Sequence, residues 1–265
     1  MTAGTFDIPV WLINLPRATG RRAAMEERMA RLGIAYQLFP GIDGRAEAER
    51  LLRNVDVPAF ERNMGRRILM GGIGCYHSHL AVWEAFLATD APVALVLEDD
   101  ILFHDDFLDA VRTGLAGVAH WDMLKLNCIR AKLPIRQGRL GTYDLNAYVG
   151  PATGTGAYLI KRATAAKLLS AMRHVTRATD HEINRFFLHD FRLLGLEPFP
   201  SHPEPGNVSL ITGTNNGDVV KLKGLRRLPY YLLKAGNYLR RAAWLARKGM
   251  LWPRNRALPL AGGKE

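Results

Sequence analysis

Three consecutive acidic residues, Glu98, Asp99 and Asp100, follow an uninterrupted apolar run at residues 94–97. Such a run is typical of a strand that is buried on both faces of a sheet. Carboxylates stacked at the end of a buried strand repel one another, and burial disfavours their ionisation. A divalent cation such as Mg²⁺ or Mn²⁺ would offset both costs, because these ions prefer oxygen ligands. The alternative is a solvated acidic turn before a helix that begins with acidic residues.

A second group of polar residues follows the first apolar run of the chain. Asn14 ends the predicted strand at residues 8–14, and Arg17, Arg21 and Arg22 come directly after it. Ligands bind at the carboxyl ends of strands in α/β sheets, and the guanidinium group suits phosphates and nucleotides. These arginines could therefore grip a nucleotide. They could equally form the solvated first turn of a helix.

Glycines precede a third candidate segment. Residues 71–74 (Gly-Gly-Ile-Gly) predict a flexible turn that opens a helix at residues 75–88, and the start of a helix can bind an anion. His77 and His79 are two positions apart, so they point to different helix faces and do not form a helical metal pair. His79 also fits the pattern of a half-buried histidine with a polar partner.

Asp180 is a fourth candidate, at the start of a helix predicted over residues 180–189. An aspartate there is first of all a helix cap, and it could also act as a general base; the spacing leaves both roles open. Earlier in the chain, residues 153–156 (Thr-Gly-Thr-Gly) lack the full dinucleotide-binding fingerprint. Their glycines instead predict close approach of the backbone to a ligand or a neighbouring strand.

The elements that must position these residues alternate between strand and helix patterns. Strands at residues 8–14 and 34–39 flank a helix at residues 20–32, with Thr19 as its N-cap and Gly33 at its end. This order predicts an α/β sheet. The further predicted elements are helices at residues 105–115 and 162–172, strands at 121–127 and 153–160, and an irregular or hairpin region at 129–147.

Composition sets the broad class. The chain has 265 residues, 48% of them hydrophobic and 23% charged, which is ordinary for a globular protein. Its two cysteines, Cys75 and Cys128, do not form a Cys-x-x-Cys pair, so we expect a reducing cytoplasm. The first residues lack a signal-peptide pattern, and no apolar run approaches the ~20 residues of a membrane span.

The net charge of +11 comes from the last part of the chain. Residues 219–265 contain 12 of the 36 basic residues and one of the 25 acidic residues, so the rest of the chain is balanced. We expect a catalytic body at residues 1–218 and a basic helical tail at residues 219–265. Pro229 and Gly236 should interrupt or kink the helix of the tail.

The tail pattern is amphipathic. One half of the helical wheel carries the basic residues, among them Arg227, Lys234, Arg241 and Lys248 at intervals of seven, with Trp244 nearer this side. Such a helix suits an anionic membrane surface. The alternatives are a helix docked on its own domain and a nucleic-acid contact, although no recognised nucleic-acid module accompanies it. The apolar half consists of Leu228, Tyr231, Leu232, Ala235, Leu239, Ala242 and Leu245.

The ordered set of motifs resembles glycosyltransferase family 25, the lipooligosaccharide-type transferases. The resemblance spans roughly residues 10–190 and lies in segments 13–22, 41–44, 74–79, 83–84, 95–100 and 156–160 and in Asp180. Two positions depart from it: Gly72 stands where the family has an acidic residue, and His77 where it has an apolar one. Residues 200–205 match only loosely, and the basic tail lies outside the resemblance.

The resemblance implies a GT-A-like nucleotide-sugar transferase fold with a mixed, mostly parallel central sheet. It also implies a UDP-sugar donor, often UDP-galactose, an Mn²⁺ or Mg²⁺ ion, and inverting transfer to a saccharide hydroxyl. The resemblance implies Asp100 as the main metal ligand, with Asp99 and Glu98 as supporting ligands. His202, later in the chain, is a further candidate ligand. Asp180 is the first candidate for the base, with Asp99 or Glu98 as alternatives. The donor-side residues are Asn14, Arg17, Arg22, Ser78, His79 and Glu98.

Together these patterns predict a hexosyltransferase that builds a lipid-linked or lipopolysaccharide-type glycan on the inner face of the cytoplasmic membrane. Residues 220–250 would hold it to the anionic surface, and we expect no nucleic-acid partner. Two other classes remain open. A nucleotidyltransferase would use the same metal and nucleoside phosphates but release pyrophosphate. A non-catalytic glycan- or nucleic-acid-binding protein would not need the acidic triplet.

Overall fold

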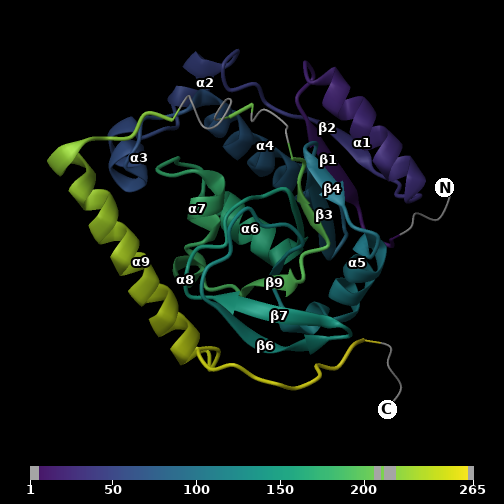
Figure 1. The fold of residues 1–265 in the computed structure, drawn as a ribbon. Helices are drawn as coiled ribbons and strands as arrows, with labels where there is room; N and C mark the ends of the chain where they lie inside the picture. Colours follow the sequence, from purple (N-terminus) through teal and green to yellow (C-terminus); the bar gives the residue numbers. More distant parts are fainter. Residues whose placement is uncertain (1–5, 206–209, 212–218, 262–265) are drawn as a thin grey trace.

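A computed structural model describes residues 6–205, 210–211 and 219–261. Figure 1 shows a central twisted sheet with helices packed around it and one long helix along the side of the molecule. The sheet has eight strands in the order β2-β1-β3-β8-β5-β9-β7-β6. These strands are β1 (Val10–Asn14), β2 (Gln37–Pro40), β3 (Val93–Glu98), β5 (Met123–Lys125), β6 (Pro134–Leu140), β7 (Tyr143–Tyr148), β8 (Ala157–Lys161) and β9 (Leu193–Glu197).

Strand directions make the sheet mixed. Strands β1, β2 and β3 are parallel to one another, as are β5 and β9, whereas β7 and β8 are antiparallel to their neighbours. Most strands therefore point the same way, and the prediction of a mixed, mostly parallel α/β sheet is confirmed. A separate two-stranded ribbon pairs β4 (Ile101–Phe103) with β10 (Ser201–Pro203).

Helices cover this sheet. They are α1 (Thr19–Arg31), α2 (Ala48–Leu52), α3 (Val57–Met64), α4 (Met70–Leu87), α5 (Phe107–Ala116), α6 (Arg162–Ala171), α7 (Thr179–Ile183), α8 (Phe186–His189) and α9 (Leu228–Arg247). Short 3₁₀ helices span Val118–His120 and Gly224–Arg227. Helix α4 packs against α6 and β1. Its buried side chains include Tyr76 and Trp83, which join the main core.

The strand register brings the candidate residues to one edge of the sheet. Ile13 of β1 pairs with Glu98 of β3, and Leu97 of β3 pairs with Ala157 of β8. The carboxyl ends of β1 and β3 therefore lie beside the amino end of the antiparallel β8. This is the edge at which an α/β sheet binds its ligands.

Several predicted boundaries are wrong. Thr19 is the first residue of α1 and makes no cap hydrogen bond. Helix α4 begins at Met70, so residues 71–74 lie in its first turns and do not form a flexible turn before it. The helix predicted at 180–189 is two short helices, α7 and α8. Asp180 is inside α7, whose N-cap position is Ala178.

The C-terminal helix α9 is continuous, and this corrects the expected interruption at Pro229 and Gly236. Pro229 occupies the first turn, where its missing N–H costs nothing. Helix α9 packs on α3 and α8. Its buried residues are Arg241, Trp244 and Leu245, and the Trp244 ring contacts Phe186 of α8. Two of these buried residues, Arg241 and Trp244, belong to the basic side of the helical wheel.

After α9 the chain runs along the outer edge of the sheet (Figure 1). The Arg254 amide donates to the Arg136 carbonyl, and the Leu258 amide donates to the Arg139 carbonyl, both at 2.8 Å. The edge strand β6 is therefore covered by the last described residues. Across the described part of the chain, no helix combines the length and the apolar character needed to cross a bilayer.

Candidate functional site

The acidic triplet lies where β3 ends. Glu98 is the last residue of β3, and Asp99 and Asp100 form the turn into β4. Both oxygens of Asp99 have partners: the Asn14 amide donates to Oδ2 at 2.6 Å, and the Arg21 guanidinium donates to Oδ1 at 3.2 Å. Asp99 therefore ties the ends of β1 and α1 to the end of β3.

Asp100 is the least neutralised member of the triplet. Burial and the charge of Glu98 raise the pKa of Asp100 to about 7. Arg21 lies 3.5 Å from Asp100 Oδ2, which offsets only part of this effect. The structure therefore holds a carboxyl group that would gain from a nearby positive charge.

Glu98 is held by a chain of buried side chains. His79 Nε2 lies 2.9 Å from Glu98 Oε1, and His79 Nδ1 lies 2.8 Å from the Tyr158 hydroxyl. The Trp83 indole N–H donates to the same hydroxyl at 2.9 Å, which leaves the Tyr158 proton to point at His79 Nδ1. In that arrangement His79 Nε2 carries its proton and donates it to Glu98.

The result is an ionised Glu98. Burial raises the pKa of Glu98, but the hydrogen bonds from His79 and Thr155 outweigh it and lower the pKa below its ordinary value. The Thr155 hydroxyl donates to the same oxygen, Oε1. Glu98 is thus a fixed negative charge at the centre of the site.

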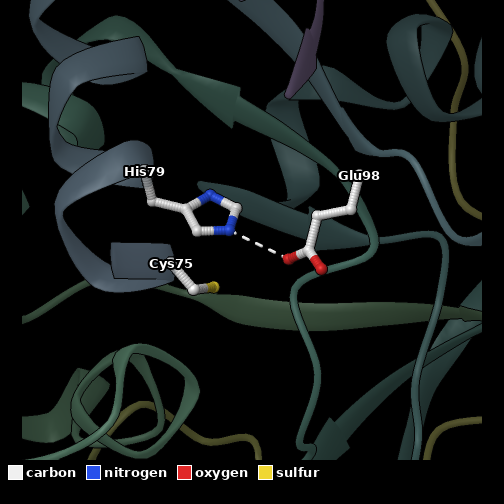
Figure 2. A group of neighbouring side chains, drawn as sticks. All are labelled: Cys75, His79 and Glu98. Atoms are coloured by element: carbon white, nitrogen blue, oxygen red, sulfur yellow. Dashed lines mark hydrogen bonds and ion pairs between the residues drawn. The ribbon is translucent and has the colours of Figure 1, made fainter. Parts of the chain in front are cut away.

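Figure 2 shows Cys75, His79 and Glu98 pointing toward one another, the first two from α4 and the third from the end of β3. One donor atom of each lies within 4.8 Å of the others, so the group could hold a metal ion. Burial raises the pKa of the Cys75 thiol well above its usual range, and the charge of Glu98 adds to this. The thiol is therefore protonated unless a cation displaces its proton.

A first cavity opens between β1, α4 and the loop at residues 41–44. The Ile42 amide donates to the Ser78 hydroxyl, which donates in turn to the Gly74 carbonyl, both at 2.8 Å. Arg17 is ion-paired with Asp43 at the mouth. The lining also includes Leu15, Arg21, Gly41, His79 and the acidic triplet.

A second cavity lies on the other side of the triplet and contains Asp180. The amides of Gly154 and His181 donate to the Asp180 carboxylate at 3.1 and 2.8 Å. Burial raises the pKa of Asp180, but the charge of His181 and the Gly154 amide outweigh it and leave the pKa below its usual value. The two cavities share Cys75, Glu98, Asp100 and Ile211.

Most of the predicted site residues come together. Asp180 lines the second cavity, and Asn14 contacts Asp99. The predicted residues that line the first cavity are Arg17, Ser78, His79, Glu98, Asp99 and Asp100. Two do not join them. Arg22 is paired with Glu26 on the exposed side of α1. His202 faces His104, with 2.6 Å between Nδ1 and Nε2, and lines neither cavity.

The sequence interpretation missed several polar residues of the site, among them Asp43, Asn127 and Thr155. Asn127 follows β5 at the same edge of the sheet as Asn14 and Glu98, so its place at the end of a predicted strand could have identified it. Asp43 and Thr155 lie in loops. Nothing in the local sequence marks Asp43 as the partner of Arg17 or Thr155 as the partner of Glu98.

The sequence of the chain is similar to those of known proteins. The chain is 32% identical over 167 residues to a glycosyltransferase 25 family member of Aedes aegypti, and 31% identical over 169 residues to one of Drosophila melanogaster. It is 26% identical over 170 residues to the inactive glycosyltransferase 25 family member 3 of Homo sapiens. The matches cover 60%, 61% and 61% of this chain, and 27%, 28% and 28% of the relatives, respectively.

The chain therefore spans less than a third of the length of these relatives, and one of them is named as inactive. A solved structure, a mannose-1-phosphate geranyltransferase from Thermus thermophilus, has 12% identity and a TM-score of 0.34, over 73% of this chain and 75% of that one. That likeness is too low to support a functional conclusion. The family model of glycosyltransferase family 25 (LPS biosynthesis protein) matches residues 7–183. The chain belongs to glycosyltransferase family 25.

Proposed function

We propose that this protein transfers a hexose from a nucleotide sugar to a saccharide hydroxyl of a lipid-linked or lipopolysaccharide-type glycan. The observation that carries the proposal is the pair of cavities that meet at Glu98 and Asp100. A transferase must hold a donor and an acceptor on two sides of one reacting centre. Two cavities with shared carboxylates provide that arrangement.

The first cavity suits the donor, for which we propose UDP-galactose. Its lining comes from the carboxyl end of β1, from α4 and from the loop at residues 41–44, and it includes Arg17 and Arg21. Guanidinium groups bind phosphate oxygens through paired hydrogen bonds. Apolar residues of the lining, Ile13, Leu15 and Ile42, provide surface for a base.

The acidic triplet fits a bound Mn²⁺ or Mg²⁺ ion. Burial and the charge of Glu98 raise the pKa of Asp100 although Arg21 lies nearby, so a further positive charge would stabilise this carboxylate, and oxygen donors suit these hard cations. Asp100, with Glu98 or Asp99, would hold the ion. Bound there, the ion would neutralise the charge that develops on a nucleoside diphosphate leaving group.

Inverting transfer needs a carboxylate that accepts the proton of the acceptor hydroxyl. We assign this role to Asp180. It lines the second cavity, its pKa is lowered, and backbone amides fix its orientation. Asp99 is a weaker candidate, because Asn14 and Arg21 already occupy both of its oxygens.

The test is sugar release from UDP-, GDP- and CMP-sugars with and without Mn²⁺, comparing the intact protein with Asp100→Asn. We expect metal-dependent hydrolysis of UDP-galactose that the variant loses, with UDP and free sugar as products. Release of pyrophosphate would identify a nucleotidyltransferase instead. Absence of hydrolysis, together with absence of UDP-sugar binding by calorimetry, would refute the transferase proposal.

We also propose that α9 holds the protein on the inner face of the cytoplasmic membrane. Leu228, Leu232 and Leu239, which are one or two helix turns apart, are 50%, 64% and 72% exposed. Exposed Arg226, Arg240 and Arg247 lie near them in the chain. An apolar stripe beside cations matches an anionic lipid surface. The helix docks through its other side and leaves this stripe open.

A further inference from the structure

The second cavity contains two buried polar side chains that make no hydrogen bond within the described chain. Both amide atoms of Asn127 and the hydroxyl of Thr179 lack a partner. Asn127 is 1% exposed and Thr179 is 4% exposed. Leaving such buried groups without a hydrogen-bond partner destabilises the folded protein, and native proteins rarely leave several together.

Both residues line the cavity that contains Asp180. Asn127 reaches it from the end of β5, and Thr179 from the first position of α7, one residue before Asp180. Gly156 leaves space for the amide, because a Cβ there would lie 2.9 Å from Asn127 Oδ1. The unpartnered atoms therefore lie on the wall of the same cavity as the proposed base.

The chemistry of these atoms selects the type of ligand. The Asn127 amide offers donors and an acceptor, and the Thr179 hydroxyl offers one of each. A phosphate would satisfy only donors, and an apolar ligand would satisfy none. A sugar hydroxyl both donates and accepts, so it can satisfy each of these atoms.

The remaining lining agrees with a pyranose. Ile129, Ala178 and Pro203 provide apolar surface in the same cavity, which suits the C–H face of a sugar ring. Arg66 is also in the lining, and Asp180 interacts favourably with its charge. The wall thus combines hydrogen-bonding groups with apolar patches, as small-molecule sites do.

We infer that Asn127 and Thr179 form a hydroxyl-recognition subsite for the acceptor, a neutral hexopyranoside whose attacking hydroxyl faces Asp180. The inference rests on the proposed transferase function and adds the residues that select the acceptor. Asn127 and Thr179 position the sugar ring; Asp180 acts on its proton. The first cavity and its nucleotide contacts contain neither of the two residues.

The test measures two ligands separately. Binding of UDP is followed by calorimetry with Mn²⁺, and binding of methyl β-galactopyranoside, β-glucopyranoside and N-acetyl-β-glucosaminide by saturation-transfer NMR, with and without UDP. The variants are Asn127→Ala and Thr179→Val, with Thr164→Val as control, because Thr164 is equally buried, at 4% exposure, but lies in α6 away from both cavities.

We expect the intact protein to bind at least one glycoside, and each variant to bind it about five- to tenfold more weakly, as loss of one buried hydrogen bond predicts. Both variants should bind UDP as the intact protein does, and the Thr164→Val control should bind both ligands as the intact protein does. Equal glycoside binding by Thr179→Val and the intact protein would overturn the subsite, as would absence of every glycoside signal while UDP binds. If the intact protein does not bind UDP, the assignment of the donor to the first cavity is refuted. The glycoside titrations without UDP would then still decide whether the subsite exists.

Discussion

Gly74 of α4 and Gly44 of the preceding loop lie in direct backbone contact. A Cβ atom on Gly74 would be 2.5 Å from the Gly44 amide nitrogen, and one on Gly44 would overlap the carbonyl of Met70. Real side-chain atoms do not approach a backbone so closely. The two glycines therefore allow the loop with Asp43 to pack on the first turns of α4 and form one wall of the first cavity.

This contact predicts the effect of Gly74→Ala. The added methyl group should push the loop away, reduce UDP affinity about tenfold or more, and lower the melting temperature by several degrees. Gly72→Ala is the matched control, because a Cβ there meets only a side-chain atom of Ile211, at 3.5 Å. Calorimetry and thermal unfolding of both variants check the prediction. Equal UDP affinity in the two variants would contradict it.

Asp180→Asn should lower the rate of donor hydrolysis or transfer by about 10²–10⁴-fold, the usual contribution of a general base. Binding of UDP-galactose should not change, because Asp180 lies outside the donor cavity. Steady-state kinetics and calorimetry measure the two effects. Asp109→Asn, at an exposed position of α5, is the control. A retained rate would transfer the role of the base to Glu98 or Asp99.

Tyr158→Phe tests whether the buried chain from Trp83 to Glu98 sets the charge of that carboxylate. Without the Tyr158 hydroxyl, His79 no longer has a fixed Nε2 proton, and its hydrogen bond to Glu98 weakens. The pKa of Glu98 should then rise, so the acidic limb of the pH profile of kcat/KM should move to higher pH. An unchanged profile with a lower melting temperature would indicate a merely structural role for Tyr158.

Asp100 gives the metal-free protein a stability that depends on pH. Its pKa is about 7 when folded and about 4 when unfolded, so the folded state binds the proton more tightly. Stability should therefore fall as pH rises from about 4 to about 7. Asparagine does not titrate, so the Asp100→Asn variant should lack this loss of stability. With EDTA present, the melting temperature of the variant minus that of the intact protein should therefore be larger at about pH 8 than at about pH 5. Addition of Mn²⁺ should raise the melting temperature of the intact protein at the higher pH.

Replacement of Leu232 and Leu239 by glutamine tests the α9 surface. Each leucine lost from a lipid interface removes ~1.5–3 kcal/mol, so binding to vesicles with anionic lipid should fall at least about tenfold. The melting temperature should not change, since both side chains are exposed. Leu52→Gln with Leu133→Gln, two exposed leucines outside α9, is the control pair. Equal vesicle sedimentation by both double variants would refute membrane attachment through α9.

Apolar runs predicted the inner strands of the sheet well. Residues 94–97 and 157–160 form strands because both faces are buried, and a continuous apolar pattern reports that condition directly. The same pattern predicted that Asn14 and Glu98 lie at the carboxyl ends of their strands. Helix α4 was harder to predict, since glycines usually mark a turn. Close backbone contacts of Gly74 with Gly44 and of Gly71 with Leu210 explain these glycines inside the helix.

Long-range partners could not be predicted from the sequence. The orientation of α9 depends on carbonyl groups of Val149 and Asn184, which bind Arg241 and compensate its burial. A helical wheel places Arg241 on the basic half of the helix, and it contains no information about these carbonyls. Likewise, His202 resembles a metal ligand in the sequence, but the pairing of β10 with β4 places it beside His104.

The segment that follows α9 has a consequence for the behaviour of the protein in solution. Its amides and carbonyls satisfy the free side of β6 at Arg136 and Arg139. An uncovered strand of that kind can pair with the same strand of another molecule and begin an aggregate. The last described residues therefore act as a built-in protection against self-association. A shortened chain that ends at Gly249 should form high-molecular-weight species at concentrations at which the full chain does not.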